Sequence, residues 1–321
     1  MKAIRKVLVI KLSAVGDFVL ALPAFERIRE AHPEAKITLL TTPPFEALAR
    51  SSPFFNTVEI DGRPENPAGW LALVARLRAA NYDRVYDLQN SGRTNLYFHA
   101  LRPFPPQWSG VAAGASHRHR SPNRMKMHAL ERQAEQLQAA GIWPDAPTAP
   151  LSAAPPDLTW ILHKTPAARP IQTTNPRPVV LLIPGASAHR PEKRWPIEHY
   201  ARLAEKLSNE GFDIVIIGGL QEAVLAHAIQ RRAPRARDLT GRTDFAQIAA
   251  FGARAALAVG NDTGPVHLVA AAGAPTIALF SSASDPAVSG PRGHVTVFQA
   301  PDLKDVPVDT VLQTGLSLAR R

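Results

Sequence analysis

The sequence predicts an α/β protein with two domains, each built around a parallel β-sheet. Short apolar runs alternate with longer amphipathic stretches up to about residue 143, as in repeated βα units. Nine prolines then fall between residues 144 and 178, a density that blocks helix interiors and central strands. The βα alternation restarts after this segment. We therefore expect domains over residues 1–143 and 179–321, joined by a linker over residues 144–178.

Apolar runs of four to six residues predict the strands of the first domain, with residues 107–111 as its last strand. The other expected strands are residues 7–12, 36–41, 57–60 and 84–88. Helices are expected at residues 16–31, 44–50, 70–80 and 94–101. The segment after residue 111 is basic and loop-like until about Met127, where a helix begins that ends at Gly141.

The second domain repeats this pattern, and a short element is expected in the linker near residues 158–162. The expected strands are residues 179–183, 213–217, 255–259 and 276–280. The expected helices are residues 197–210, 221–231, 245–252, 265–272 and 307–318. We expect that the last helix could pack back on the first domain.

Composition excludes several classes of protein. The hydrophobic fraction of 45% and the charged fraction of 20% are typical of a globular domain, and no apolar run reaches the ~18 residues of a membrane span. The basic and apolar start resembles a signal peptide, but Lys11 and Asp17 interrupt it, so we expect a cytoplasmic protein. The absence of cysteine excludes disulfides, thiolate metal ligands and a cysteine nucleophile.

The net charge of +10 is concentrated in the first half of the chain. Residues 1–143 carry 19 Lys and Arg against 12 Asp and Glu, whereas residues 144–321 carry 18 against 15. Such a charge attracts phosphates, anionic lipid headgroups or nucleic acid without distinguishing them. A basic rim is expected in the first domain, at Arg93, Arg118, Arg120, Arg124 and Lys126. A solvated basic loop is the alternative; nucleic acid is not expected, because no recognised binding module accompanies the charge.

The stretch from Leu257 to Phe280 is the most informative one for a ligand. It predicts a buried strand, a polar turn, a helix and a second buried strand. Asp262 or Thr263 is a natural N-cap, and the following proline tolerates the first helical position. A helix N-terminus that follows a parallel strand favours a phosphate group, and His267 lies one turn into the helix. A well-capped βαβ crossover without a ligand is the alternative.

Three further loops follow predicted strands. KLSAVGD places Asp17 at a helix start, where it either complements the helix dipole or acts as a general base. PGASAHRPEKRWP offers backbone N–H groups near Ser187 and then a cluster of cations that includes Lys193, suited to a diphosphate leaving group or to a solvated loop. GGLQE lets a ligand approach two glycines, with Glu222 placed to bind sugar hydroxyls.

Together and in this order, these loops resemble glycosyltransferase family 9, the heptosyltransferases of bacterial lipopolysaccharide synthesis. The matching motifs are KLSAVGD, PGASAHRPEKRWPIEHYARLAEKL, GG with Glu222, DLTGRTDFAQIAAFGARA, and GNDTGPVHLVAAAGAPTIALF followed by SSASDP, which span nearly the whole chain. KLSAVGD differs from the KTSSMGD-like form of the enzyme that adds the first heptose, so the resemblance is to the family and not to that enzyme.

The resemblance implies the GT-B arrangement of two facing Rossmann-like domains, with the acceptor mainly on the first and the nucleotide-sugar mainly on the second. It implies inverting transfer of heptose from an ADP-activated donor to a lipopolysaccharide inner-core acceptor at the inner membrane surface, without a metal or other cofactor. Asp17 matches the catalytic carboxylate and Lys193 a lysine that contacts the donor phosphates. Further donor contacts are expected at Ser187, Glu222, Asp262, Thr263, Gly264 and His267.

Other readings stay open from the sequence. The same fold could use a different nucleotide-sugar or glycan acceptor, or an inactive relative could bind nucleotide-sugars and organise an assembly. An NAD-dependent oxidoreductase is poorly supported, because the first loop lacks the GxGxxG pattern.

Overall fold

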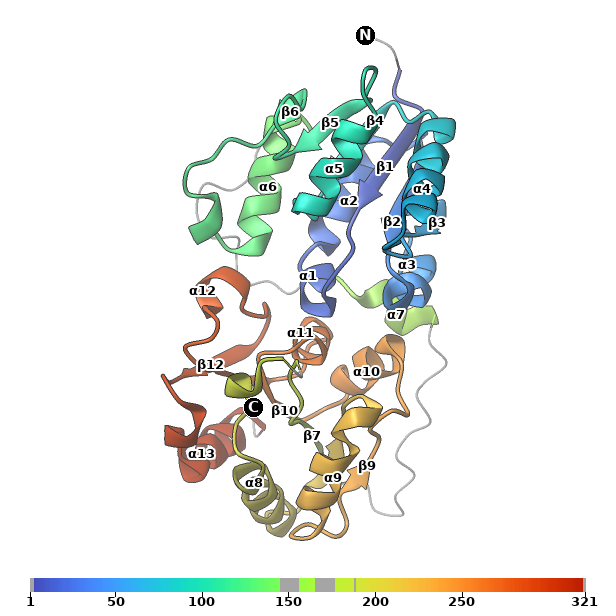
Figure 1. The fold of residues 1–321 in the computed structure, drawn as a ribbon. Helices are drawn as coiled ribbons and strands as arrows, with labels where there is room; N and C mark the ends of the chain where they lie inside the picture. Colours follow the sequence, from blue (N-terminus) through green and yellow to red (C-terminus); the bar gives the residue numbers. More distant parts are fainter. Residues whose placement is uncertain (1–2, 145–155, 165–176, 188, 320–321) are drawn as a thin grey trace. The chain divides into compact units, whose positions relative to one another are not determined.

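Two six-stranded parallel sheets, one in each half of the chain, organise the structure (Figure 1). It is a computed structural model that describes residues 3–144, 156–164, 177–187 and 189–319. Its contacts divide the chain into two units, residues 1–151 and residues 152–321. The boundary falls inside the linker expected over residues 144–178, most of which lies outside the described residues.

The first sheet has the strand order β3-β2-β1-β4-β5-β6, and every neighbouring pair is parallel. Its strands are β1 (Lys6–Ile10), β2 (Lys36–Thr41), β3 (Thr57–Ile60), β4 (Arg84–Asp87), β5 (Gln107–Gly110) and β6 (His117–Arg118). Its helices are α1 (Val15–Val19), α2 (Leu22–Ala31), α3 (Glu46–Ser51), α4 (Pro67–Ala80), α5 (Gly92–Ala100) and α6 (Ala129–Ala139), with 3₁₀ turns at Pro43–Phe45 and Arg124–Lys126.

The second sheet repeats this topology in the order β12-β11-β10-β7-β8-β9. Its strands are β7 (Val179–Ile183), β8 (Asp213–Ile216), β9 (Arg237–Asp238), β10 (Leu257–Asn261), β11 (Thr276–Phe280) and β12 (Val295–Gln299). Its helices are α7 (Thr159–Lys164), α8 (Ile197–Asn209), α9 (Ala223–Gln230), α10 (Phe245–Gly252), α11 (Gly264–Ala271), α12 (Pro286–Ser289) and α13 (Val308–Ala319), with 3₁₀ turns at Pro191–Lys193, Leu220–Glu222 and Leu303–Asp305. Both orders are those of the Rossmann fold.

Several predicted elements need correction. The helix expected over residues 16–31 is two helices, because Pro23 near the start of α2 has no N–H to continue the ladder from α1. Residues 107–111 do not form the last strand of the first sheet, since β6 pairs with β5 inside the basic segment. The strands β9 and β12 were not predicted; β9 has two residues, and β12 lies at a sheet edge and is only partly buried.

The apolar runs form the cores on which the loops are mounted. The central strands β1, β7, β10 and β11 are almost wholly buried, as expected of strands covered on both faces. α13 contributes Val311 and Leu316 to the core of the second unit and packs against α8 and β10. Whether this helix also returns to the first unit, as the sequence suggested, stays a prediction. The short element expected near residues 158–162 is α7, which packs against α10.

His32, at the end of α2, supplies a pH-dependent term to stability. Its Nε2 lies 2.7 Å from the hydroxyl of Tyr86, and burial, together with the charges of Arg84 and Arg29, lowers its pKa to about 4. The unfolded chain has a histidine pKa near 6.5, so between about pH 4 and 6.5 the folded state binds fewer protons than the unfolded state. Stability from this source is therefore complete above about pH 6.5 and is lost as the pH falls towards 4.

We predict that His32→Gln removes this dependence while keeping a polar partner for Tyr86. Urea unfolding at pH 4.5 and pH 7 should show a difference between wild type and variant that changes by up to about 3 kcal/mol, since one pKa unit corresponds to ~1.4 kcal/mol. Parallel pH profiles for the two proteins would contradict the assignment.

Candidate functional site

The polar loops predicted from the sequence follow the carboxyl ends of the central strands. In both sheets the strand order reverses direction next to the first strand, between β1 and β4 and between β7 and β10. Ligands of open α/β sheets bind at such switch points, because the loops on either side diverge there and leave a crevice. Each unit therefore presents its own candidate site at this edge.

In the second unit a pocket of about 250 Å³ lies at the switch point. It is lined by the loops that follow β7 and β8 and by the start of α11: Ile183, Gly185, Ala186, Ser187, Gly218, Gly219, Gln221, Glu222, Thr263 and Pro265. Three predicted donor residues, Ser187, Glu222 and Thr263, thus share one pocket although they come from three loops.

An ion pair stands at the N-terminus of α11. The Nζ atom of Lys193 lies 2.6 Å from Oδ2 of Asp262, and only 19% and 9% of the two side chains are exposed. Both residues were predicted as donor contacts, and the structure brings them together. The carboxylate of Asp262, the residue before the N-cap, positions the ammonium group at the start of the helix, whose N-terminus carries a partial positive charge.

The start of α11 is built as expected. Of the two N-cap candidates, Thr263 is the N-cap, although its hydroxyl makes no capping hydrogen bond. Gly264 is the first helical residue, followed by a proline. His267 lies in the first turns of the helix and is buried. Gly260 is required for close packing, since a Cβ there would lie 2.5 Å from a methyl group of Val266.

Glu222 is buried and held by its own loop. Its Oε2 accepts a hydrogen bond of 2.5 Å from the backbone N–H of Gly219. A Cβ at Gly185 would lie 2.8 Å from the Glu222 carboxyl carbon, so this glycine makes room for the side chain. The carboxylate therefore lines the pocket in a defined position, where it can accept hydrogen bonds from hydroxyl groups.

Asn261, which the sequence reading did not single out, connects the loops of this site. Its Nδ2 donates to the carbonyl oxygens of Pro184, at 2.8 Å, and Gly185, at 3.3 Å. Its Oδ1 accepts from the backbone N–H of Trp195, at 3.0 Å, and from the Tyr200 hydroxyl, at 3.1 Å. One wholly buried amide thus ties both ends of the loop between β7 and α8, which carries Lys193, to the end of β10.

The remaining cations of the loop before α8 have structural partners. Arg194 donates to the carbonyl of Ala186 at 2.9 Å, and Arg190 pairs with Glu192 at 2.7 Å. Of the cations predicted to surround a diphosphate, Lys193 is thus the one that the structure joins to the start of α11.

In the first unit, Asp17 lies on α1, directly after the loop that follows β1. Its Oδ2 accepts a hydrogen bond of 3.3 Å from the backbone N–H of Ala14, and the side chain is partly exposed. Phe18 anchors α1, because its ring packs against the rings of Phe25 and Phe45. A carboxylate so placed can accept a proton from a hydroxyl group bound at this edge of the sheet.

Gln89, after β4, holds the Asp17 loop across the switch point. Its Oε1 accepts from the backbone N–H groups of Leu12, at 2.9 Å, and Ser13, at 3.2 Å. This arrangement parallels that of Asn261: in each unit an amide side chain from the fourth strand's end binds the backbone of the loop after the first strand.

Two buried charges lie beneath the same loop. Burial lowers the pKa of Lys11, although the nearby carboxylates of Asp17 and Asp87 oppose this shift. Burial also raises the pKa of Asp87 to about 6, against the opposing effect of backbone N–H groups that include that of Asn90. The ammonium group donates to the carbonyl of Leu88 at 3.4 Å. The Asp17 carboxylate therefore lies close enough to the buried Lys11 to interact with it electrostatically.

The predicted basic rim divides into bound and available cations. Arg93 is bound: it contacts the buried Asp61 at 3.3 Å and donates to the Tyr97 hydroxyl, which in turn bonds to Asp61. Arg118 donates to the Val111 carbonyl from β6. Arg120 and Lys126 are exposed.

Arg124 is partly buried and lies near a second cation, Arg132. The sequence analysis did not predict Arg132 as part of the basic rim. Burial lowers the pKa of both guanidinium groups, and the nearby charge of Arg132 lowers the pKa of Arg124 further. Asp17 partly offsets the shift of Arg132, so this cation lies near the Asp17 carboxylate. Among the described residues neither arginine forms an ion pair with a carboxylate within 4 Å. Two such cations favour an anionic ligand.

Comparison with known proteins identifies a protein family that this chain matches. The model of glycosyltransferase family 9 (heptosyltransferase) matches residues 70–304. Lipopolysaccharide heptosyltransferase 2 of Salmonella typhimurium is 28% identical over 306 residues, covering 90% of this chain and 86% of that protein. The corresponding Escherichia coli protein is also 28% identical, over 313 residues with the same coverage.

Solved structures show the same fold. The structure of E. coli ADP-heptose lipopolysaccharide heptosyltransferase II superimposes with a TM-score of 0.79 at 24% identity, covering 98% of both chains. E. coli heptosyltransferase WaaC with ADP has a TM-score of 0.76 at 22% identity, covering 98% of this chain and 99% of that one. The expected GT-B fold is thereby confirmed.

We predict that Asn261→Ala destabilises the second unit by about 3 kcal/mol or more, because it leaves buried N–H, hydroxyl and carbonyl groups without partners at about 1–3 kcal/mol each. Urea unfolding measures the loss. Asn209→Ala, at the exposed end of α8, is the matched control and should change stability by less than about 0.5 kcal/mol. An equal effect of the two substitutions would show that Asn261 is not the connection described above.

Proposed function

The chain belongs to glycosyltransferase family 9, and we propose that it transfers a heptose from an ADP-activated donor to an inner-core sugar of lipopolysaccharide, with inversion at the anomeric carbon. The relatives named above are lipopolysaccharide heptosyltransferases, one E. coli structure is named an ADP-heptose lipopolysaccharide heptosyltransferase, and the other is of heptosyltransferase WaaC with ADP. The observation that carries the proposal is the Lys193–Asp262 pair at the start of α11, beside the pocket that holds Ser187, Glu222 and Thr263.

The donor half of the proposal follows from the chemistry of the leaving group. Cleavage of the sugar–phosphate bond places negative charge on ADP, and preorganised positive groups lower the barrier most when they need no rearrangement. Lys193 and the N–H groups of Thr263 and Gly264 are such groups. The donor sugar and ribose hydroxyls then bind to Glu222, and Ser187 and His267 complete the donor contacts.

The acceptor half assigns Asp17 as the general base. It takes the proton from the attacking hydroxyl as the new glycosidic bond forms and the bond to ADP breaks. Gln89 keeps the loop that carries Asp17 in place. Because Lys193 and α11 supply the charge for the leaving group, the proposed reaction uses no metal and no other cofactor.

We further assign the basic surface of the first unit to the acceptor. Inner-core sugars carry carboxylate and phosphate groups, which Arg124 can bind together with the exposed Arg118, Arg120 and Lys126. Arg93 contributes through its position between Asp61 and the edge of the sheet. The proposed place of action is the cytoplasmic face of the inner membrane. No described helix has the length and apolarity needed to cross a membrane.

We predict that Asp17→Asn lowers kcat by about 10²–10⁴-fold, the usual contribution of a positioned general base. The affinity for ADP-heptose should stay unchanged, because Asp17 belongs to the first unit and the donor pocket belongs to the second. The measurement is ADP release with truncated lipopolysaccharide as acceptor, paired with calorimetry of donor binding. A variant that turns over at the wild-type rate would exclude Asp17 as the base.

We predict that Lys193→Ala weakens ADP-heptose binding by about ten- to a hundred-fold, since a charge-assisted hydrogen bond contributes ~1.5–3 kcal/mol. Calorimetry with ADP-, UDP- and GDP-sugars tests both the residue and the donor. Lys206→Ala, an exposed lysine on α8 that pairs with Asp309, is the control and should bind normally. Preference for a UDP- or GDP-sugar would overturn the heptose assignment while leaving the family intact.

A further inference from the structure

The helix α4 is apolar on its exposed face as well as on its buried face. Leu73, Val74 and Leu77 point into the core of the first unit. Its exposed residues are, besides Pro67 at its start, Ala68, Leu71, Ala72, Ala75, Arg76, Arg78 and Ala79. A helix at the surface of a globular protein normally carries charged and polar residues on its outer face. α4 carries two arginines there and no acid.

The helix α5 and the turn after it continue this surface. The rings of Trp70 on α4 and Tyr97 on α5 are 5.4 Å apart. At the other end, the Arg78 guanidinium donates to the carbonyl oxygens of Ala100, at 2.5 Å, and Arg102, at 3.4 Å. These contacts join both ends of α4 to the C-terminal part of α5 and to the turn that follows it. We call the surface formed by Leu71, Arg78, Leu96, Arg102 and Phe104 the α4–α5 face.

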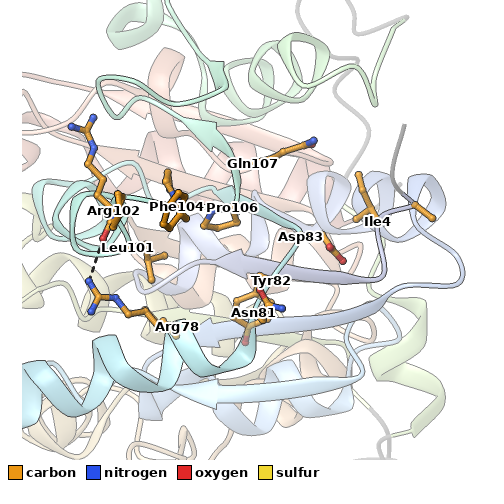
Figure 2. A pocket seen from close by; sticks show the side chains of 14 residues that line it. Ile4, Arg78, Asn81, Tyr82, Asp83, Leu101, Arg102, Phe104, Pro106 and Gln107 are labelled. Atoms are coloured by element: carbon orange, nitrogen blue, oxygen red, sulfur yellow. Dashed lines mark hydrogen bonds between the residues drawn. The ribbon is translucent and has the colours of Figure 1, made fainter.

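Three large apolar side chains of this face are exposed to solvent: 66% of Leu71, 57% of Leu96 and 91% of Phe104. Phe104 stands in the sequence Arg-Pro-Phe-Pro-Pro, and the flanking prolines restrict the backbone that presents it. Figure 2 shows Phe104 among Arg78, Leu101 and Arg102 at a pocket of about 570 Å³. The rigid turn thus holds an aromatic ring in water beside two cations.

Acids are few around the face, and Glu59 is paired with Arg76 of α4, with 3.1 Å between Oε2 and Nε. No Asp or Glu occurs from residue 66 to 82 or from residue 88 to 130. Asp83, which falls between these segments and lines the same pocket, accepts hydrogen bonds from the backbone N–H groups of Arg5 and Lys6. Separate apolar side chains set among cations match an anionic lipid surface, which attracts the cations and admits the apolar groups between its headgroups.

We propose that the α4–α5 face docks this chain on an anionic phospholipid bilayer. The inference extends the proposed function, from which it takes the lipid-linked nature of the acceptor, and it names the surface that contacts the membrane. Leu71, Leu96 and Phe104 enter the headgroup region, while Arg78 and Arg102 pair with lipid phosphates. The face lies outside the groups that we assign to catalysis and donor binding.

The test is co-sedimentation of the full chain with lipid vesicles, without donor or acceptor. Wild type should bind vesicles that contain phosphatidylglycerol and should bind phosphatidylcholine vesicles at least about ten-fold more weakly, and salt should reduce the binding. The triple variant Leu71→Ser, Leu96→Ser, Phe104→Ser should lose binding by about ten-fold or more. Val224→Ser removes a side chain that is 69% exposed on α9 of the second unit, and it should bind like wild type.

Three results would overturn the proposal: no binding of wild type to phosphatidylglycerol vesicles, equal binding by the triple variant, or equal binding to both lipids. A dimer in size-exclusion chromatography that dissociates in the triple variant, without vesicle binding, would instead assign the face to a second copy of the chain. Thermal unfolding verifies that the triple variant is folded. Calorimetry with ADP-heptose is run on the same proteins, so that failure of the membrane proposal is distinguished from failure of the proposed function.

Discussion

A single buried amide, which joins both ends of the loop between β7 and α8 to the end of β10, organises the donor side of this protein. Asn261 can donate and accept at the same time, so it binds two carbonyl groups of the loop after β7 and two donors of the segment that carries Lys193. An apolar residue would remove all four hydrogen bonds, and a carboxylate could not donate to the carbonyls. The position of Lys193 against α11 depends on this connection.

The same solution recurs in the first unit, where Gln89 binds the backbone of the Asp17 loop. Parallel strands that diverge at a switch point leave the loops on either side without ladder hydrogen bonds, so a side chain must supply them. Because the two units share one topology, each has loops at its switch point that need hydrogen bonds from a side chain. The chemistry mounted on the two loops differs: a carboxylate near a buried lysine in the first unit, a cation at a helix N-terminus in the second.

The strands with continuous buried apolar runs were predictable, and β2, β7 and β11 match their expected bounds residue for residue. The partly buried edge strand β3 also matches its expected bounds. β6, β9 and β12 were missed because two-residue strands and half-exposed edge strands have no such signal. The positions of Asp17, Thr263 and Glu222 were predictable because a local turn follows a recognisable strand, whereas their roles stay predictions. Asn261, Gln89 and Arg132 were missed, since their roles arise from partners that are distant in sequence.

By itself, the sequence determined the alternation of strands and helices, the loops that carry polar groups, and, through its motifs, the family. These are local properties, set by apolar periodicity and turn chemistry within a few residues. Only the tertiary structure joined Lys193 to Asp262, 69 residues away, and tied Arg93 to Asp61. Only it laid two helices together so that their apolar and basic residues form one surface, because such contacts depend on how the strands are ordered in the sheet.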